Sequence, residues 1–255
     1  MKISLSSQRP MAQTDELDFV VELMVDVLAH DDFGGDDEDA GDPEEINDSD
    51  FFNVAEAATD FDTRESHVDP AKRLNFDGKA ESEFLVGRIW AERLEWFHAE
   101  ECGFEVSSVC DARSGTWMQV LETLSRNAGR TLRKDLDLTN FVSDVVFIHE
   151  VLLHPDISDR VAVLDAAIKT MSSDNSLVLM YHEQSETRHL EDWECGALGF
   201  KKIARSNLLL KDNHFRYPFG DSHTAGREVN LVATAEHEAW ILGQWEELIT
   251  DHPSL

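Results

Sequence analysis

The stretch VVFIHEVLL at residues 145–153 decides the fold predicted for this chain. Its β-branched and apolar residues are typical of a buried strand, and Pro155 ends it. Apolar residues then recur at helical spacing over residues 157–171, and a second apolar strand, SLVLMY, occupies residues 176–181. A strand, a helix and a second strand in this order predict an α/β domain with a parallel crossover.

Further elements are predicted on both sides of this strand–helix–strand unit. Downstream, we expect a helix at residues 190–198 that Gly199 stops, and then a strand at 203–211. A loop at 215–226, a second strand at 229–234 and a closing helix at 235–249 follow. Upstream, we expect a strand at residues 3–7 and a helix at 17–28 that Thr14 caps. A short helix at 51–58, a strand at 104–110 and a helix at 116–127 that Ser114 caps follow. Residues 84–96 fit neither period. These elements predict a central mixed β-sheet flanked by helices, with residues 1–30 and 51–255 in one domain.

The chain is strongly acidic, with 52 Asp and Glu residues against 22 Lys and Arg residues and a formal net charge of −30. Phosphate contacts need Lys and Arg, so we expect neither nucleic acid nor an anionic membrane as a partner. The charge serves solubility or adaptation to salt, or else it mimics DNA or attracts a basic protein surface. No apolar run reaches the roughly 18 residues of a membrane span.

The cysteine and histidine patterns indicate neither disulfides nor a metal. Three scattered cysteines form no disulfide framework and no zinc-type pair: Cys102, Cys110 and Cys195. Because the N-terminus also lacks the apolar stretch of a secretion signal, we expect a reduced, cytoplasmic compartment. His182, Glu183 and His189 lack the HExxH spacing, so no metal is expected. The oligomeric state is not determined by the sequence.

Residues 31–50, DDFGGDDEDAGDPEEINDSD, hold eleven acidic residues and neither Lys nor Arg. Such a segment cannot bury enough apolar surface to offset its ordering entropy, so it is predicted to be a flexible loop. A calcium loop is the alternative. The spacing of Asp32, Gly34, Asp36 and Gly41 does not reproduce the EF-hand pattern of alternating ligands, central glycine and closing Glu.

Residues 148–156, IHEVLLHPD, and the tripeptide Leu198-Gly199-Phe200 resemble two landmarks of the GNAT N-acetyltransferases. The first is similar to the central strand of that family and the turn after it, and the second to the end of the helix that follows the next strand. The resemblance covers residues 142–212. It implies a GNAT-like fold, acetyl-CoA as cofactor and N-acetyl transfer. Together with the acidic surface, it implies a cationic amine as substrate, either a small molecule or a lysine side chain.

The resemblance also implies roles for individual residues. His149 and Glu150 stand where the family often carries its general base, and strand alternation would put them on opposite faces. Cys195 stands at the position of a tyrosine that acts as general acid in the family. The backbone of Leu152 and Leu153 would flank the acetyl carbonyl. The pyrophosphate of the cofactor would bind at the start of the next helix, at Ser158, Arg160, Val161, Ala162 and Val163.

The segment at the pyrophosphate position departs from the family pattern. Ser158 replaces Arg or Gln, and Val161 and Val163 stand where small residues let backbone N–H groups approach a phosphate. Two function classes follow. The chain is an acetyl-CoA-dependent N-acetyltransferase of a cationic amine, or it is a catalytically degenerate GNAT-like domain that acts as a binding module, for example for a basic protein.

Overall fold

The computed structural model describes residues 1–8, 16–30, 83–126, 131–136, 138, 141–182, 190–213 and 231–251. The predicted Thr14 cap, the acidic loop at 31–50, the short helix at 51–58 and the loop at 215–226 lie outside these residues. No helix in the described ranges is long and apolar enough to cross a membrane.

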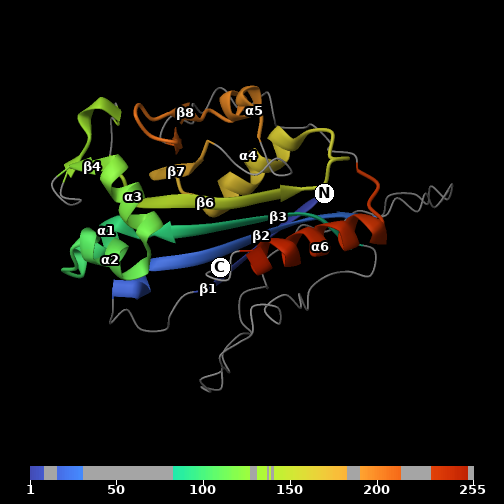
Figure 1. Cartoon of the computed structure of the whole chain (residues 1–255), viewed down its shortest axis with the longest axis horizontal. Helices are drawn as coiled ribbons and strands as arrows, with labels where there is room; N and C mark the ends of the chain where they lie inside the picture. The colour runs from blue at the N-terminus through green and yellow to red at the C-terminus, as the bar shows by residue number, and fades with distance from the viewer. Residues whose placement is uncertain are drawn as a thin grey trace, which may run out of the picture. The chain divides into compact units, whose positions relative to one another are not determined.

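Seven strands form one mixed sheet in the spatial order β1-β2-β3-β6-β7-β9-β8 (Figure 1). Their bounds are Lys2–Gln8 (β1), Val20–His30 (β2), Glu83–Leu94 (β3), Asp144–Leu153 (β6), Ser176–Tyr181 (β7), Lys201–Lys202 (β8) and Leu208–Asp212 (β9). Neighbouring strands are antiparallel except β6 and β7, which run parallel and are joined through helix α4 (Arg160–Met171). A separate two-stranded ladder joins β4 (Ser125–Arg126) to β5 (Thr131–Leu132). The predicted α/β class, mixed sheet and parallel crossover are therefore confirmed.

Helices cover both faces of the sheet. The first face, called the α4 face below, packs against α4 and α5 (Asp192–Ala197). The second, called the α3 face, packs against α1 (Trp96–Glu101), α2 (Val106–Arg113) and α3 (Gly115–Leu124). Helix α6 (Ala235–Asp251) also covers the α3 face, because its Trp245 lies 5.3 Å from the Arg88 guanidinium there. Figure 1 shows α1–α3 grouped at one end of the long strands and α6 beside the other. Two short 3-10 helices, Glu16–Phe19 and Lys134–Leu136, complete the described elements.

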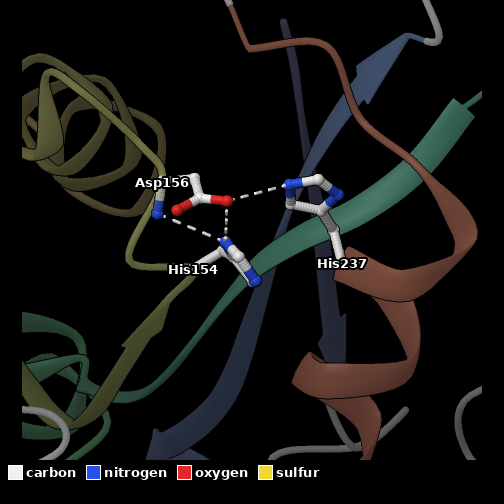
Figure 2. A group of neighbouring side chains, drawn as sticks. All are labelled: His154, Asp156 and His237. Carbon is white, nitrogen blue, oxygen red and sulfur yellow. Dashed lines mark hydrogen bonds and ion pairs between the residues drawn. The ribbon is translucent and has the colours of Figure 1, made fainter.

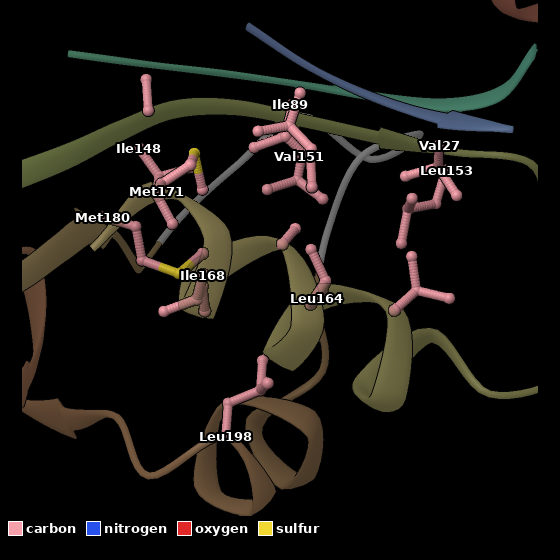
Figure 3. Packing of buried hydrophobic residues seen from close by; sticks show 14 of the residues in the cluster. Val27, Ile89, Ile148, Val151, Leu153, Leu164, Ile168, Met171, Met180 and Leu198 are labelled. Carbon is pink, nitrogen blue, oxygen red and sulfur yellow. The ribbon is translucent and has the colours of Figure 1, made fainter. Parts of the chain in front are cut away.

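Each face has its own apolar core. On the α4 face, Ile89 and Ile148 of the sheet pack against Leu164 and Ile168 of α4 (Figure 3). On the α3 face, the Phe147 ring meets a helix side chain edge-on, with its centroid 6.2 Å from that of Trp117. Full burial stabilises the fold by about 1.5–3 kcal/mol for each such side chain. Because both faces of the sheet are packed, the strands are held in place, and this fixes the direction of the polar side chains that project from them.

The helix predicted at residues 17–28 is wrong, because these residues form a 3-10 turn followed by strand β2. Val21, Leu23, Val25 and Val27 are all buried on the α4 face, so the apolar pattern has a period of two. β-branched residues at alternate positions favour a strand, and pairing with both β1 and β3 satisfies its backbone.

The strand predicted at residues 104–110 is also wrong. The segment enters helix α2, whose buried Val106, Val109 and Cys110 have helical spacing. The ambiguous segment at residues 84–96 is strand β3, which ends before Trp96 begins α1.

Most other predicted elements are confirmed with small shifts. The strands at 145–153 and 176–181 match β6 and β7, and the helices at 157–171 and 235–249 match α4 and α6. Ser114 Oγ accepts a hydrogen bond from the Trp117 N–H at 3.3 Å, as a helix cap should. Gly199 adopts a φ of 85°, which suits a helix stop. The strand predicted at 203–211 begins only at Leu208, and residues 231–234 are not a strand.

Candidate functional site

Strand β6 contains a bulge at His149. Trp90 pairs with Glu150, but the next residue of β3 pairs with Ile148, so His149 is an extra residue in the ladder. Ile148 and Val151 are both buried on the α4 face, although three positions separate them. The prediction that His149 and Glu150 face opposite sides is therefore wrong, because the bulge interrupts the alternation. Both residues lie on the α3 face.

A hydrogen bond joins His149 to a carboxylate on the neighbouring strand. His149 Nε2 lies 2.8 Å from Glu92 Oε2, and the Trp117 indole N–H donates to the same oxygen at 2.7 Å. The Arg113 guanidinium donates to Glu92 Oε1 at 2.6 Å. The Glu92 side chain is only 4% exposed, so these donors replace the water that a carboxylate would otherwise bind.

The charge state of Glu92 follows from these contacts. Burial raises its pKa, but the hydrogen bond and charge of His149 and the charge and hydrogen bond of Arg113 together outweigh burial and lower it. Glu92 is therefore an ionised acceptor, and His149 Nε2 carries the proton that it shares with the carboxylate. The other ring nitrogen, Nδ1, is left as the basic atom of His149.

Two aromatic rings fix the orientation of the His149 imidazole. The Trp90 ring stacks on it with centroids 3.8 Å apart, and the Phe147 ring meets it edge-on at 4.7 Å. The His149 side chain is 14% exposed, so it still reaches solvent. A histidine that is held by a carboxylate, stacked and partly open has the features of a general base.

Two further ion pairs lie on the same face of the sheet, one partly exposed and one buried. Arg113 also donates to Glu22 at 2.6 Å, and Arg88 donates to both carboxylate oxygens of Asp26 at 2.7 and 3.1 Å. The Arg88 side chain is 3% exposed, and its Nη1 has no hydrogen-bond partner among the residues that the structure describes. Buried ion pairs offset their desolvation only with good geometry, so a sheet face rich in them is a candidate functional surface.

Leu152 and Leu153, which are expected beside the acetyl carbonyl, lie beyond the part of β6 that pairs with β7. That pairing ends where Ile148 meets Met180. Leu152 and Leu153 follow, and both side chains are buried. Their side chains are core residues, so only their backbone groups could take the role that the resemblance implies.

The start of α4, the expected pyrophosphate site, is capped by the chain itself. Asp159 accepts a hydrogen bond from the Ala162 N–H at 3.0 Å. Val163 is buried in the core of the α4 face, and Val161 packs against that core. Ser158 is exposed, and Arg160 Nε lies 3.5 Å from Glu194. One backbone donor of this helix end is thus occupied by a carboxylate, which also repels an anion.

Cys195 lies on α5 and is buried in the core of the α4 face. Burial raises the pKa of its thiol, and Asp192 and Glu194 raise it further. The structure therefore brings His149 and Glu150 together on one face of the sheet and places Cys195 behind the other.

A cavity of about 510 Å³ lies between α3, the end of β7 and the turn before β9. Within the described ranges its lining is polar and contains two cations but no carboxylate: Gln119, Thr123, His182, Lys202, Arg205, Ser206 and Asn207. Arg205 has a φ of 66°, a conformation that costs a residue other than glycine about 1–2 kcal/mol. Arg205 and Lys202 give the cavity a positive lining, which can accommodate an anionic group.

Contacts link this cavity to His149. Phe147 touches the His149 ring and also the Tyr181 ring, whose centroid lies 5.2 Å away. The Tyr181 hydroxyl donates to Gln119 of the cavity at 3.3 Å. The cavity and the histidine therefore belong to the same face of the sheet.

Comparison with known protein families, curated proteins and solved structures gives no match.

The sequence pointed to His149 but not to its partners Glu92, Arg113 and Trp117. One signal was available: Arg88, Trp90 and Glu92 alternate with apolar residues in the segment that fitted neither period.

Proposed function

We propose that this chain transfers an acyl group to a cationic amine, with His149 as the general base. The hydrogen bond between Glu92 and His149 carries the proposal. An amine must lose a proton as it attacks a carbonyl, and His149 Nδ1 can take it while Glu92 stabilises the imidazolium through Nε2. The same nitrogen can then give this proton to the departing thiolate of a thioester donor, which leaves as the thiol.

The charges around His149 favour a cationic acceptor. Four carboxylates on the α3 face outnumber the two guanidinium groups that pair with three of them, in a chain of net charge −30. The carboxylates are those of Glu22, Asp26, Glu92 and Glu150, and the guanidinium groups are those of Arg88 and Arg113. Such a field raises the local concentration of a cation and speeds its encounter with the site. A polyamine or a lysine side chain has this charge and carries the nucleophilic nitrogen.

The resemblance of residues 148–156 and 198–200 to the GNAT family supports acetyl-CoA as the donor, which would supply the acyl group as a thioester. Its phosphates need cationic or N–H partners. The capped start of α4 offers few of these, whereas the basic cavity offers Lys202 and Arg205. We therefore place the donor phosphates at the cavity.

Calorimetry with acetyl-CoA tests the donor site. A dissociation constant below about 100 μM is expected, equivalent to roughly −5.5 kcal/mol. Lys202→Gln with Arg205→Gln should weaken binding at least about tenfold, through the loss of two charge-assisted contacts. Lys201→Gln is the matched control, since that lysine is exposed beside the cavity but does not line it. Equal affinity in all three proteins would place the phosphates elsewhere.

One observation favours a second function, that of a binding module without catalysis. Asp159 caps α4 where the resemblance puts the pyrophosphate, so its carboxylate occupies one backbone donor there and would repel an anion. In that case acetyl-CoA would not bind at millimolar concentration, while a Lys-rich peptide would still bind in a salt-dependent way.

A further inference from the structure

Three side chains that could hold a metal ion meet where β6 leaves the sheet (Figure 2). His154 and Asp156 come from the turn between β6 and α4, and His237 comes from the first turn of α6. Asp156 Oδ2 lies 3.7 Å from His154 Nδ1 and 3.4 Å from His237 Nε2. All three potential ligand atoms lie within 4.8 Å of one another.

These separations are close to those of a tetrahedral zinc site. Zinc binds histidine nitrogen at about 2.0–2.1 Å and carboxylate oxygen at about 2.0–2.2 Å, which puts tetrahedral ligands roughly 3.3–3.5 Å apart. Asp156 Oδ2 already meets this spacing with His237 and nearly meets it with His154. The ligand atoms of the two rings also lie within 4.8 Å of each other, so small adjustments of the rings and of the exposed Asp156 side chain would complete the geometry.

The surroundings hold the two imidazoles in place. The His154 ring packs against the Trp240 ring with centroids 5.0 Å apart, and lies 4.4 Å from the His237 ring. The Thr234 N–H donates to His237 Nδ1 at 3.1 Å, and Thr234 Oγ1 lies 2.7 Å from the same nitrogen, so both contacts orient the ring. Metal binding at Nε2 would move the ring proton to Nδ1, where Oγ1 can accept it in place of the N–H contact. Both histidine side chains are about 15% exposed, so an ion can reach them.

Metal binding would also replace a contact at His154. The Asp156 N–H donates to His154 Nδ1 at 3.2 Å, a long hydrogen bond that a zinc ion would displace.

We propose that His154, Asp156 and His237 form a zinc-binding site with a fourth position open to water. The ion would join the turn after β6 to α6, two segments that the sequence leaves 83 residues apart. Zinc is preferred because two imidazoles and one carboxylate suit it, and three protein ligands leave the fourth tetrahedral position free. The proposal does not depend on acyl transfer.

The test is titration of the chelator-treated full chain with Zn²⁺ by calorimetry and with Co²⁺ by visible absorption. We expect one tight site, with a dissociation constant below about 10 μM, and the intense absorption of tetrahedral Co²⁺. His237→Gln and Asp156→Ala should each weaken Zn²⁺ binding at least about 100-fold, since each removes a ligand. Asp156 is largely exposed, so its replacement leaves the fold intact.

His98→Gln is the matched control, because His98 lies on α1 and contacts Glu101 rather than this cluster. It should bind Zn²⁺ as the unaltered chain does. Absence of Zn²⁺ binding at about 1 mM, or binding that Asp156→Ala and His237→Gln leave unchanged, would overturn the proposal; unchanged binding would show that the acidic surface alone attracts the ion.

Discussion

Glu92 and His149 lie 57 residues apart in the chain, yet His149 Nε2 is 2.8 Å from Glu92 Oε2. Glu92 is on β3 and His149 is the bulged residue of β6, so the pairing of these two strands creates the contact. The bulge turns His149 and Glu150 to the same face, and Trp90 stacks on the imidazole. A local irregularity in the sheet thus assembles the candidate base and its partner.

Glu92→Gln should destabilise the chain by about 2–4 kcal/mol, because it leaves the Arg113 charge with only Glu22 and weakens three hydrogen bonds. Urea unfolding followed by circular dichroism measures this free energy. Glu122→Gln, on the exposed side of α3, is the control and should change it by less than about 0.5 kcal/mol. Equal effects of the two substitutions would show that the buried network contributes nothing.

The stability of the chain should fall in acid because of Glu92. Burial raises the pKa of Glu92, but His149 and Arg113 outweigh it, so the folded pKa lies below the ordinary value of 4.5. Its contribution is complete above the unfolded pKa and is lost as pH falls through the folded one. Unfolding free energies at pH 5, 4 and 3 should therefore decline less steeply in Glu92→Gln. Identical slopes would contradict the lowered pKa.

The sequence predicted the elements best where local signals agree. VVFIHEVLL is long, apolar and bounded by Pro155, and Ser114 and Gly199 mark helix ends. The sequence led to a wrong prediction where the apolar positions of a segment suit both the helical and the strand period. Residues 17–28 have apolar positions at helical spacing and at alternate positions, and only pairing with β1 and β3 decides for a strand.

The candidate site was predicted only in part, for the same reason. His149 stands in a strand that could be recognised, but the bulge depends on how β3 pairs with it, which no local pattern reveals. Glu92 lies in a segment without a clear period, and His237 lies far from His154 in the chain. Contacts between segments distant in the chain bring together both the Glu92–His149 pair and the cluster of His154, Asp156 and His237.

A second pH effect is expected at His154 in the presence of a chelator. Burial and the charge on His237 lower the pKa of His154 below 6.5, while Asp156 raises it. The folded state therefore binds fewer protons, and stability is lost as pH falls from 6.5 through the folded pKa. Thermal unfolding between pH 7.5 and 5 should show a smaller decline in His154→Gln. A decline as steep as in the unaltered chain would rule out His154 as its source.

Gly87→Ala should destabilise the sheet by about 1–3 kcal/mol through overpacking. A Cβ at Gly87 would lie 2.5 Å from Leu153 Cδ2 and 3.2 Å from the Leu152 carbonyl oxygen, where β3 meets the end of β6. Gly243→Ala is the contrasting case, since no atom of the described part of the chain lies within 4 Å of a Cβ there and alanine favours a helix by about 1 kcal/mol. Chemical denaturation should give opposite signs for the two; a neutral Gly87→Ala would refute the close packing.

The most direct test of acyl transfer by His149 is kcat/KM for acetyl-CoA and the best amine of a panel of polyamines and lysine peptides, measured for the unaltered chain, His149→Gln and His98→Gln. Circular dichroism first establishes that all three are folded. His149→Gln should lower kcat/KM by about 10²–10⁴-fold, as loss of a general base does, while His98→Gln leaves it unchanged. Full activity in His149→Gln, or no turnover of any amine by the unaltered chain, would contradict the assignment of His149 as the base of an acyltransferase.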